Sequence, residues 1–217
     1  MYKNHDVITN LRIYDLFESM VASGYSMIDD YEVGCVNNAL SDLEYCEKVE
    51  NNIFLSHSAK RALQLLKKPL NSGHCSFAKG IVVNMDLTFT NKAWIEFQRY
   101  HFADIVTGMS TMHRINKFNL ANVFNEFTDQ EIISRLQKLQ EKYNADRSQE
   151  NYLKLLYSTP AGLKMTGRIT TNYLQLMNIW SQRHNHRLPE WRQFCKELQD
   201  KLPFFEDFLR ANGRIDE

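Results

Sequence analysis

The chain has 217 residues, of which 43% are hydrophobic and 12% aromatic, and its formal net charge is zero. This composition is typical of a globular protein with a full-sized core and excludes an intrinsically disordered chain. The apolar stretches are all short, so no segment is expected to cross a membrane. The four cysteines show neither metal-ligand spacing nor a Cys-x-x-Cys pair, and residues 1–6 lack the blocks of a signal peptide. The expected location is therefore the reducing cytoplasm.

The zero net charge hides an uneven distribution along the chain. Residues 1–56 carry ten acidic residues against three Lys/Arg, whereas residues 57–125 carry nine Lys/Arg against three acidic residues. A basic segment inside a neutral protein favours an anionic small ligand over a nucleic-acid surface, which usually needs a strongly basic domain. Two oppositely charged faces that pair with each other explain the pattern equally well.

The first half of the chain predicts strands and helices in alternation. Residues 7–22 indicate a short strand that enters an amphipathic helix, while the acidic region 23–56 has no clear assignment. Ser58 is a suitable N-cap for a helix over 59–68. Residues 81–89 alternate in the manner of a strand. The apolar face of that strand would consist of Val83, Met85, Leu87 and Phe89.

The second half is predicted to be mainly helical. Asn91 is expected to cap a helix that carries Trp94 and Phe97. Further helices are predicted over about 128–143, 149–157 and 170–183, then from Pro189, and finally between Pro203 and about 211. No internal repeat or linker is visible, so residues 1–217 are expected to form a single domain. The expected fold class is α+β: mixed, helix-rich, with at least one antiparallel sheet region.

The predicted helix over 170–183 combines a wide apolar surface with three polar side chains. At 100° per residue its apolar side chains spread over roughly 220°, whereas packing on one core needs ~100°. On such a helix Asn172 and Arg183 point in nearly the same direction, and Asn178 projects from the opposite side. The helix is therefore expected to be buried from more than one direction. Its polar groups are either satisfied within the core or part of a ligand site.

A second segment, 96–114, carries side chains suited to binding phosphate. Arg99 and His101 lie beside the end of a predicted helix, and Ser110 and Arg114 follow after a glycine. Arginine offers a planar fork that matches phosphate oxygens, and serine hydroxyls complete such sites. The same residue types are also common on solvated helix faces.

A third segment, Gly73-His74-Cys75-Ser76-Phe77, forms a turn just before the predicted strand. A cysteine in this position is more typical of a small buried residue than of a nucleophile. His184 and His186 lie two residues apart and so face different ways on a helix, and no carboxylate stands at a convincing spacing from them. No metal site is expected.

Together these segments resemble the signature of the flavin-dependent thymidylate synthases. The order is the same: Gly-His-x-Ser-Phe, a strand, a helix ending in an arginine-containing segment, and a later serine. The family then has a proline, an asparagine twelve residues on, a second asparagine six further on, an arginine five beyond that, and a tryptophan in the next helix. The corresponding residues here are Pro160, Asn172, Asn178, Arg183 and Trp191. The resemblance covers about residues 70–118 and 155–212.

The resemblance implies a fold with an antiparallel sheet core flanked by helices. It implies a homotetramer whose active sites form where subunits meet, which would explain the wide apolar surface over 170–183. The implied enzyme is a methyltransferase that acts on a pyrimidine deoxynucleotide monophosphate, with reductive methylation of dUMP at C5. Methylenetetrahydrofolate would donate the methylene group, NADPH would reduce FAD, and the flavin would supply the hydride.

Site residues follow from the resemblance by position. Contacts to the flavin are assigned to His74, Ser76, Arg99, Tyr100, His101, Asn172 and Asn178. Contacts to the nucleotide are assigned to Gln98, Ser110, Arg114 and Arg183. Arg183 and Arg99 are the predicted catalytic side chains, with Arg183 facing the pyrimidine as charge develops on it.

The sequence departs from the family pattern mainly over residues 99–114. The family's Arg-His-Arg reads Arg-Tyr-His at 99–101, and one of its glutamines is Glu96. One of its arginines is Met112, with Arg114 as the nearest substitute. Three functions are therefore considered: methylation of dUMP, flavin- and folate-dependent methylation or hydroxymethylation of another pyrimidine nucleotide, and nucleotide binding without catalysis.

Overall fold

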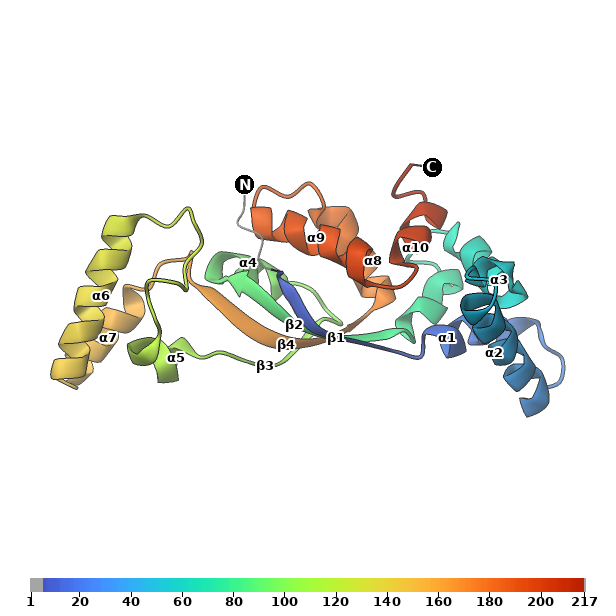
Figure 1. The fold of residues 1–217 in the computed structure, drawn as a ribbon, viewed down its shortest axis with the longest axis horizontal. Helices are drawn as coiled ribbons and strands as arrows, with labels where there is room; N and C mark the ends of the chain where they lie inside the picture. Colours follow the sequence, from blue (N-terminus) through green and yellow to red (C-terminus); the bar gives the residue numbers. More distant parts are fainter. Residues whose placement is uncertain (1–5, 217) are drawn as a thin grey trace.

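A four-stranded antiparallel sheet runs through the middle of the protein in the computed structural model, which describes residues 6–216 (Figure 1). Residues 1–5, part of the N-terminal segment inspected for a signal peptide, lie outside the described residues. The strand order is β1-β2-β4-β3, and neighbouring strands are antiparallel. The strands are β1 (Ile8–Tyr14), β2 (Val82–Thr90), β3 (Asp104–Gly108) and β4 (Lys164–Asn172).

The helices form three groups around this sheet (Figure 1). Over one face lie α4 (Asn91–Phe97), α8 (Tyr173–Arg183) and α9 (Pro189–Lys201). At one end lie α1 (Leu16–Ala22), α2 (Val33–Lys48), α3 (His57–Leu66) and α10 (Phe205–Ala211). At the opposite end lie α5 (Thr111–Arg114), α6 (Gln130–Ala145) and α7 (Gln149–Tyr157). A 3₁₀ segment, η3 (Gly73–Lys79), leads into β2.

Strand β2 confirms the alternation read from the sequence. Its four predicted apolar side chains are all fully buried: Val83, Met85, Leu87 and Phe89. They belong to the same core cluster as the buried side chains of α8 and α9, while the alternate side chains of the strand are only partly buried. Burial of one face fixes the register of a strand, because a slip by one residue would turn every apolar side chain outward.

Two predicted helix caps are wrong by a small margin. The cap of α3 is Ser56 rather than Ser58, and its Oγ accepts a hydrogen bond from the Ala59 N–H at 3.1 Å. The cap of α4 is Thr90 rather than Asn91. A cap residue must keep an extended backbone outside the helix, and Ser58 and Asn91 already lie inside.

The predicted helix over 170–183 is wrong at its start. Residues 164–172 form β4, which pairs with β2 along nine residues, from Val82↔Asn172 to Thr90↔Lys164. Asn172 has an extended backbone, and its Oδ1 accepts a hydrogen bond from the Gln175 N–H at 2.9 Å. Asn172 is therefore the N-cap of α8 and not a side chain on the surface of that helix.

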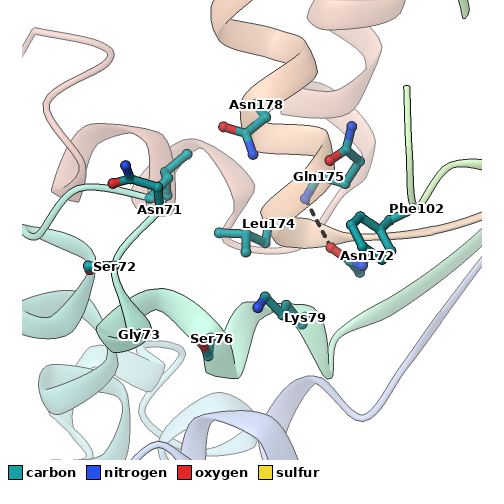
Figure 2. Close-up of a pocket in the computed structure, with 11 residues that line it drawn as sticks. Asn71, Ser72, Gly73, Ser76, Lys79, Phe102, Asn172, Leu174, Gln175 and Asn178 are labelled. Atoms are coloured by element: carbon teal, nitrogen blue, oxygen red, sulfur yellow. Dashed lines mark hydrogen bonds between the residues drawn. The ribbon is translucent and has the colours of Figure 1, made fainter. Parts of the chain in front are cut away.

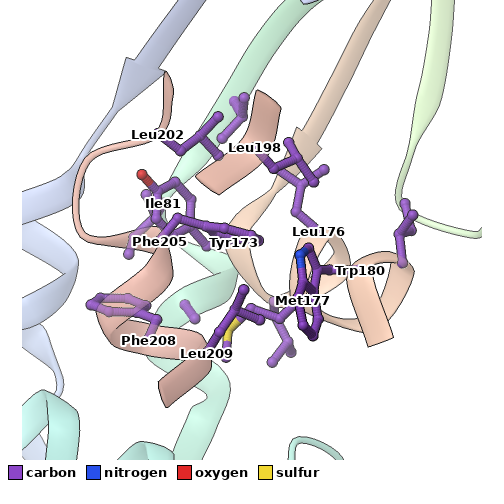
Figure 3. Packing of buried hydrophobic residues seen from close by; sticks show 14 of the residues in the cluster. Ile81, Tyr173, Leu176, Met177, Trp180, Leu198, Leu202, Phe205, Phe208 and Leu209 are labelled. Atoms are coloured by element: carbon purple, nitrogen blue, oxygen red, sulfur yellow. The ribbon is translucent and has the colours of Figure 1, made fainter. Parts of the chain in front are cut away.

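Burial of α8 from several directions is confirmed, and it is achieved within one chain. Its apolar side chains are all buried: Tyr173, Leu174, Leu176, Met177, Ile179 and Trp180. Figure 3 shows four of them, Tyr173, Leu176, Met177 and Trp180, near Leu198 of α9 and Phe205, Phe208 and Leu209 of α10. Subunit contacts are thus not needed to explain the wide apolar surface, so that explanation is corrected. The homotetramer itself stays a prediction.

Most of the other predicted helices are confirmed, and one helix was not predicted. Helices α7, α9 and α10 agree with the predicted ranges, and Pro189 occupies the first turn of α9. Helix α2 lies in the region that had no assignment. Helix α6 agrees with the predicted helix over about 128–143 to within two residues, and it buries Ile133 and Leu136.

Candidate functional site

A cavity of about 440 Å³ opens between η3, the first turns of α8 and the loop before β3 (Figure 2). We refer to it as the η3–α8 pocket. It is lined by Leu70, Asn71, Ser72, Gly73, Ser76, Lys79, Phe102, Asn172, Leu174, Gln175 and Asn178. The pocket exists because the ends of β2 and β4 are paired, and because the Tyr173 N–H donates to the Ile81 carbonyl at 3.1 Å. This pairing places η3 beside the start of α8.

Three residues predicted to contact a flavin line this pocket together: Ser76, Asn172 and Asn178. The expectation that Asn178 projects away from Asn172 is wrong, because it counted Asn172 as a helix residue. Asn172 lies at the end of a strand, and Asn178 is on the same side of α8 as Gln175 and Leu174, three and four residues earlier. Three segments that are distant in the sequence therefore meet at one cavity.

The pocket holds several polar side chains that are free to bind a ligand. Within residues 6–216, the side chains of Asn71, Lys79, Gln175 and Asn178 make no hydrogen bond. Ser72 also belongs to the wall of the pocket, but its Oγ is buried and faces the Cys75 thiol, so it is not available to a ligand.

An exposed aromatic ring stands at the rim of the pocket. Phe102 is 74% exposed and has a backbone φ of 61°, a left-handed conformation that is strained for a bulky residue. Its carbonyl accepts a hydrogen bond from the Thr171 Oγ1 at 2.8 Å, which ties this strained position to β4. The phenyl ring therefore offers a planar apolar surface beside the polar groups of the pocket.

His74 lies on the other side of η3. It lines a neighbouring cavity of about 600 Å³ together with Ser19, Ser23 and Ser26, and only Gly73 and Ser76 are shared with the η3–α8 pocket. The segment 73–77 thus separates two cavities: His74 lines only the second, whereas Ser76 lines both.

Arg183 lies in a separate cluster near the end of α8. Its Nε donates to the Tyr100 Oη at 2.7 Å, and its Nη1 donates to the Glu96 Oε2 at 3.0 Å. The guanidinium also stacks over the Trp191 ring, 4.9 Å from the ring centre. Nη2 makes no hydrogen bond within the described part of the chain. Arg183 is thus held from one side, with one edge of the guanidinium free.

Glu96 is the centre of this cluster. Its Oε2 accepts from Arg183, accepts from the Trp191 Nε1 at 3.2 Å, and lies 3.3 Å from the His186 Nε2. The Glu96 side chain is mostly buried, so its charge is balanced by Arg183 instead of facing a ligand as an unpaired anion. A carboxylate in place of the family's glutamine is in this way accommodated inside the protein.

The pKa of His186 leads us to expect that the stability of the protein depends on pH. Burial lowers the pKa of His186 below its ordinary value of 6.5, Arg183 and Arg187 lower it as well, and the attraction of Glu96 and Glu190 only partly opposes them. Above about pH 6.5 the histidine is neutral in both the folded and the unfolded chain, whereas below it the unfolded chain binds the proton more readily. The free energy of unfolding should therefore decrease as the pH falls below this value.

Urea unfolding of the wild type and of His186→Gln, from neutral pH to about pH 5, measures this contribution. The variant should lose less stability than the wild type over that range. An equal or larger loss in the variant would contradict the lowered pKa.

The other predicted residues lie just after α4 and in or beside α5, on either side of β3. Arg99 and His101 are exposed, and within residues 6–216 their side chains make no hydrogen bond. Gln98 lines a small cavity of about 240 Å³ beside Trp94. Ser110 caps α5, and Arg114 ends that helix on the surface. Within one chain, none of these residues therefore lines the η3–α8 pocket.

Several lining residues were missed by the sequence reasoning. Gln175 could have been found, because a cap at Asn172 places it in the first turn of α8. Asn71 and Ser72 precede the Gly-His-x-Ser-Phe segment and were treated only as a turn. Lys79 and Phe102 carry no signal in the sequence, because their place in the pocket depends on how η3 and the loop before β3 pack against α8.

Comparison with known proteins establishes the fold. No family model matches the sequence, and no curated protein sequence matches it. A crystal structure of thymidylate synthase X (ThyX) from Helicobacter pylori with FAD and dUMP superposes with a TM-score of 0.56 at 16% identity, covering 94% of this chain and 95% of the other. A second structure, of flavin-dependent thymidylate synthase ThyX from Helicobacter pylori complexed with FAD and dUMP, gives 0.59 at 18% identity, covering 93% and 97%. The fold is that of flavin-dependent thymidylate synthase.

The shared fold extends beyond the segments that carry the sequence resemblance. With 93% or more of the chain covered, most of the first 70 residues belong to the common fold. The predicted α+β fold, an antiparallel sheet flanked by helices, is confirmed. A bilayer-spanning helix is absent from residues 6–216, where none of the helices has the required length and hydrophobicity.

Proposed function

We propose that this protein is a flavin-dependent methyltransferase that converts dUMP to thymidylate with methylenetetrahydrofolate, FAD and NADPH. The observation that carries the proposal is the η3–α8 pocket, where Ser76, Asn172 and Asn178 converge. The pocket occurs in a fold shared with thymidylate synthases whose structures contain FAD and dUMP. Location in the cytoplasm and a single domain over residues 1–217 remain part of this proposal.

The residues present fit a flavin in the η3–α8 pocket. A cavity of about 440 Å³ is within the usual range of ligand sites. The amides of Gln175 and Asn178 are unpartnered within residues 6–216 and can both donate to and accept from the polar edge of a flavin ring. Phe102 can cover a planar ring from the rim. Bound FAD would supply the hydride that completes the methyl group.

Arg183 would act on the pyrimidine. Its guanidinium is fixed by Tyr100 and Glu96, and the free Nη2 edge is the part available to a substrate. A fixed donor stabilises charge that develops on the pyrimidine without having to reorganise during the reaction. Arg99 is the second predicted catalytic residue and is exposed on the surface of the single chain.

A homotetramer would complete the site. The predicted nucleotide contacts Gln98, Ser110 and Arg114 lie along α4 and α5, away from the η3–α8 pocket of the same chain. Hydride transfer from a flavin in the pocket to a nucleotide held by these residues therefore requires the segment 96–114 of one subunit to face the pocket of another. Active sites between subunits follow from this requirement.

The Glu96–Arg183 ion pair favours a second candidate, one-carbon transfer to another pyrimidine nucleotide such as dCMP. A guanidinium that is already paired with a carboxylate attracts an anionic ring less than an unpaired guanidinium does. The product would be a methylated or hydroxymethylated nucleotide. Nucleotide binding without flavin and without catalysis is the third possibility.

Three measurements separate these functions. Purified protein that retains the visible absorbance of flavin would argue against a non-catalytic nucleotide-binding role. Incubation with FAD, methylenetetrahydrofolate and NADPH, followed by mass spectrometry, should show a methylated product from dUMP, and the gene should rescue a thymidine auxotroph. A modified product from dCMP alone would support the second candidate. Bound flavin with no product from either nucleotide would refute the synthase proposal.

A further inference from the structure

The η3–α8 pocket has one charged side chain among its lining residues, and that residue is Lys79. Lys79 is the last residue of η3 and is exposed, and its ammonium group makes neither an ion pair nor a hydrogen bond within residues 6–216. Figure 2 shows it extending into the space between η3 and α8, opposite Leu174. No acidic side chain lines the pocket, so this charge has no local counterion. An unpaired ammonium facing a neutral polar cavity favours an anionic ligand.

The other end of η3 offers a neutral hydrogen-bonding group. Asn71 lines this end of the pocket, and its amide makes no hydrogen bond within the described residues. The seven residues of η3 separate Asn71 from Lys79 by roughly 14 Å, at about 2 Å per residue of a 3₁₀ helix. A single inorganic phosphate is too small to reach both ends. The two groups together select an extended ligand with an anionic part and a neutral polar part.

We propose that Lys79 is the phosphate-binding residue of this pocket, and that the pocket takes an extended nucleotide laid along η3. The phosphate of that nucleotide lies at Lys79, and its neutral end reaches Asn71. The assignment rests on the proposed function, which supplies two ligands of this chemistry, FAD and dUMP. Neither residue belongs to the set assigned by resemblance to the synthase family.

The experiment compares Lys79→Ala and Lys79→Glu with the wild-type chain, and uses Lys138→Ala as a matched control. Lys138 is an exposed lysine on α6 that does not line the pocket. Affinities for FAD, FMN, riboflavin and dUMP are measured by titration at low and at raised salt. The Lys79 side chain makes no ion pair or hydrogen bond within residues 6–216, so both variants should fold as the wild type does. Circular dichroism checks this.

Loss of a charge-assisted hydrogen bond should weaken FAD and FMN binding by roughly tenfold in Lys79→Ala, and by more in Lys79→Glu. Riboflavin lacks the phosphate and should bind both variants and the wild type alike. The salt dependence of FAD binding should decrease in Lys79→Ala and stay unchanged in Lys138→Ala. Asn71→Ala should weaken FAD binding without changing its salt dependence, because Asn71 is uncharged.

The remaining outcomes distinguish the subsite from the proposed activity. A loss confined to dUMP would support the subsite and identify the substrate as the source of the phosphate. Lys79-dependent binding of dUMP by a protein that binds no flavin would leave the subsite standing and refute the flavin proposal. Wild-type affinities for every ligand in Lys79→Ala would overturn the subsite while leaving the proposed activity intact. No binding of any ligand by the wild type would overturn both.

Discussion

Replacing Arg183 by alanine is expected to lower turnover by at least about a hundredfold, which is the usual effect of removing one fixed donor from a developing charge. Arg183 is held by Tyr100 at 2.7 Å and by Glu96 at 3.0 Å, so its position does not depend on the ligand. The variant leaves Glu96 with two partners, Trp191 and His186, and should therefore keep the fold. Steady-state kinetics with dUMP and thermal unfolding of the same samples give the two readouts.

Two further variants separate the role of Arg183 in turnover from its role in the cluster. Glu96→Gln keeps a hydrogen-bond acceptor beside the guanidinium but removes the negative charge, so most of the activity should remain. Arg187→Ala is the matched control, because Arg187 is an exposed arginine close to the end of the same helix. Full activity in Arg183→Ala would show that the catalytic assignment is wrong. Loss of activity together with loss of the fold would indicate a structural role instead.

The second large effect is expected at Phe89, whose replacement by alanine should lower the free energy of unfolding by about 3–5 kcal/mol. The Phe89 ring is fully buried and contacts four other aromatic rings, with centroid distances from 4.8 Å to 6.2 Å. These rings are Trp94, Phe97, Trp191 and Phe194. Removing the central ring leaves a cavity that the surrounding α4, α9 and β2 cannot close.

Urea unfolding at a fixed protein concentration measures this effect, and Phe127→Ala is the control. Phe127 is 71% exposed, so its loss should change stability by less than about 0.5 kcal/mol. Phe89→Leu keeps much of the volume and should cost less than Phe89→Ala. A loss below about 1 kcal/mol in Phe89→Ala would mean that the site repacks around the missing ring.

Local signals explain why some elements were predicted well. Strand β2 alternates because one of its faces is buried, and that period is visible in the sequence itself. Helix α7 begins at the cap residue Ser148 and α9 begins at Pro189, both of which are local features. Helix α2 was missed because it buries only Leu43 and Cys46, so its sequence has no continuous apolar stripe.

Strand β4 shows where local signals fail. It mixes polar, basic and only two apolar residues, Met165 and Ile169, and Gly167 lies between them. Its conformation is set by pairing with β2 on one side and β3 on the other, with partners about eighty and sixty residues away in the chain. Such long-range hydrogen bonds override local propensity. The same pairing ends the strand at Asn172 and thereby fixes where α8 begins.

The sequence by itself determined the residue types and spacings from Pro160 to Trp191, the apolar face of β2, and the fold that the family resemblance implied. Only the tertiary structure decided which of the polar side chains meet. It brought Asn178 to the same pocket as Asn172 and Ser76, added Lys79 and Phe102, and placed Arg183 against Glu96. The physical reason is that a pocket is made by packing between η3, β4 and α8, and the direction of each side chain depends on where strand ends and helix begins.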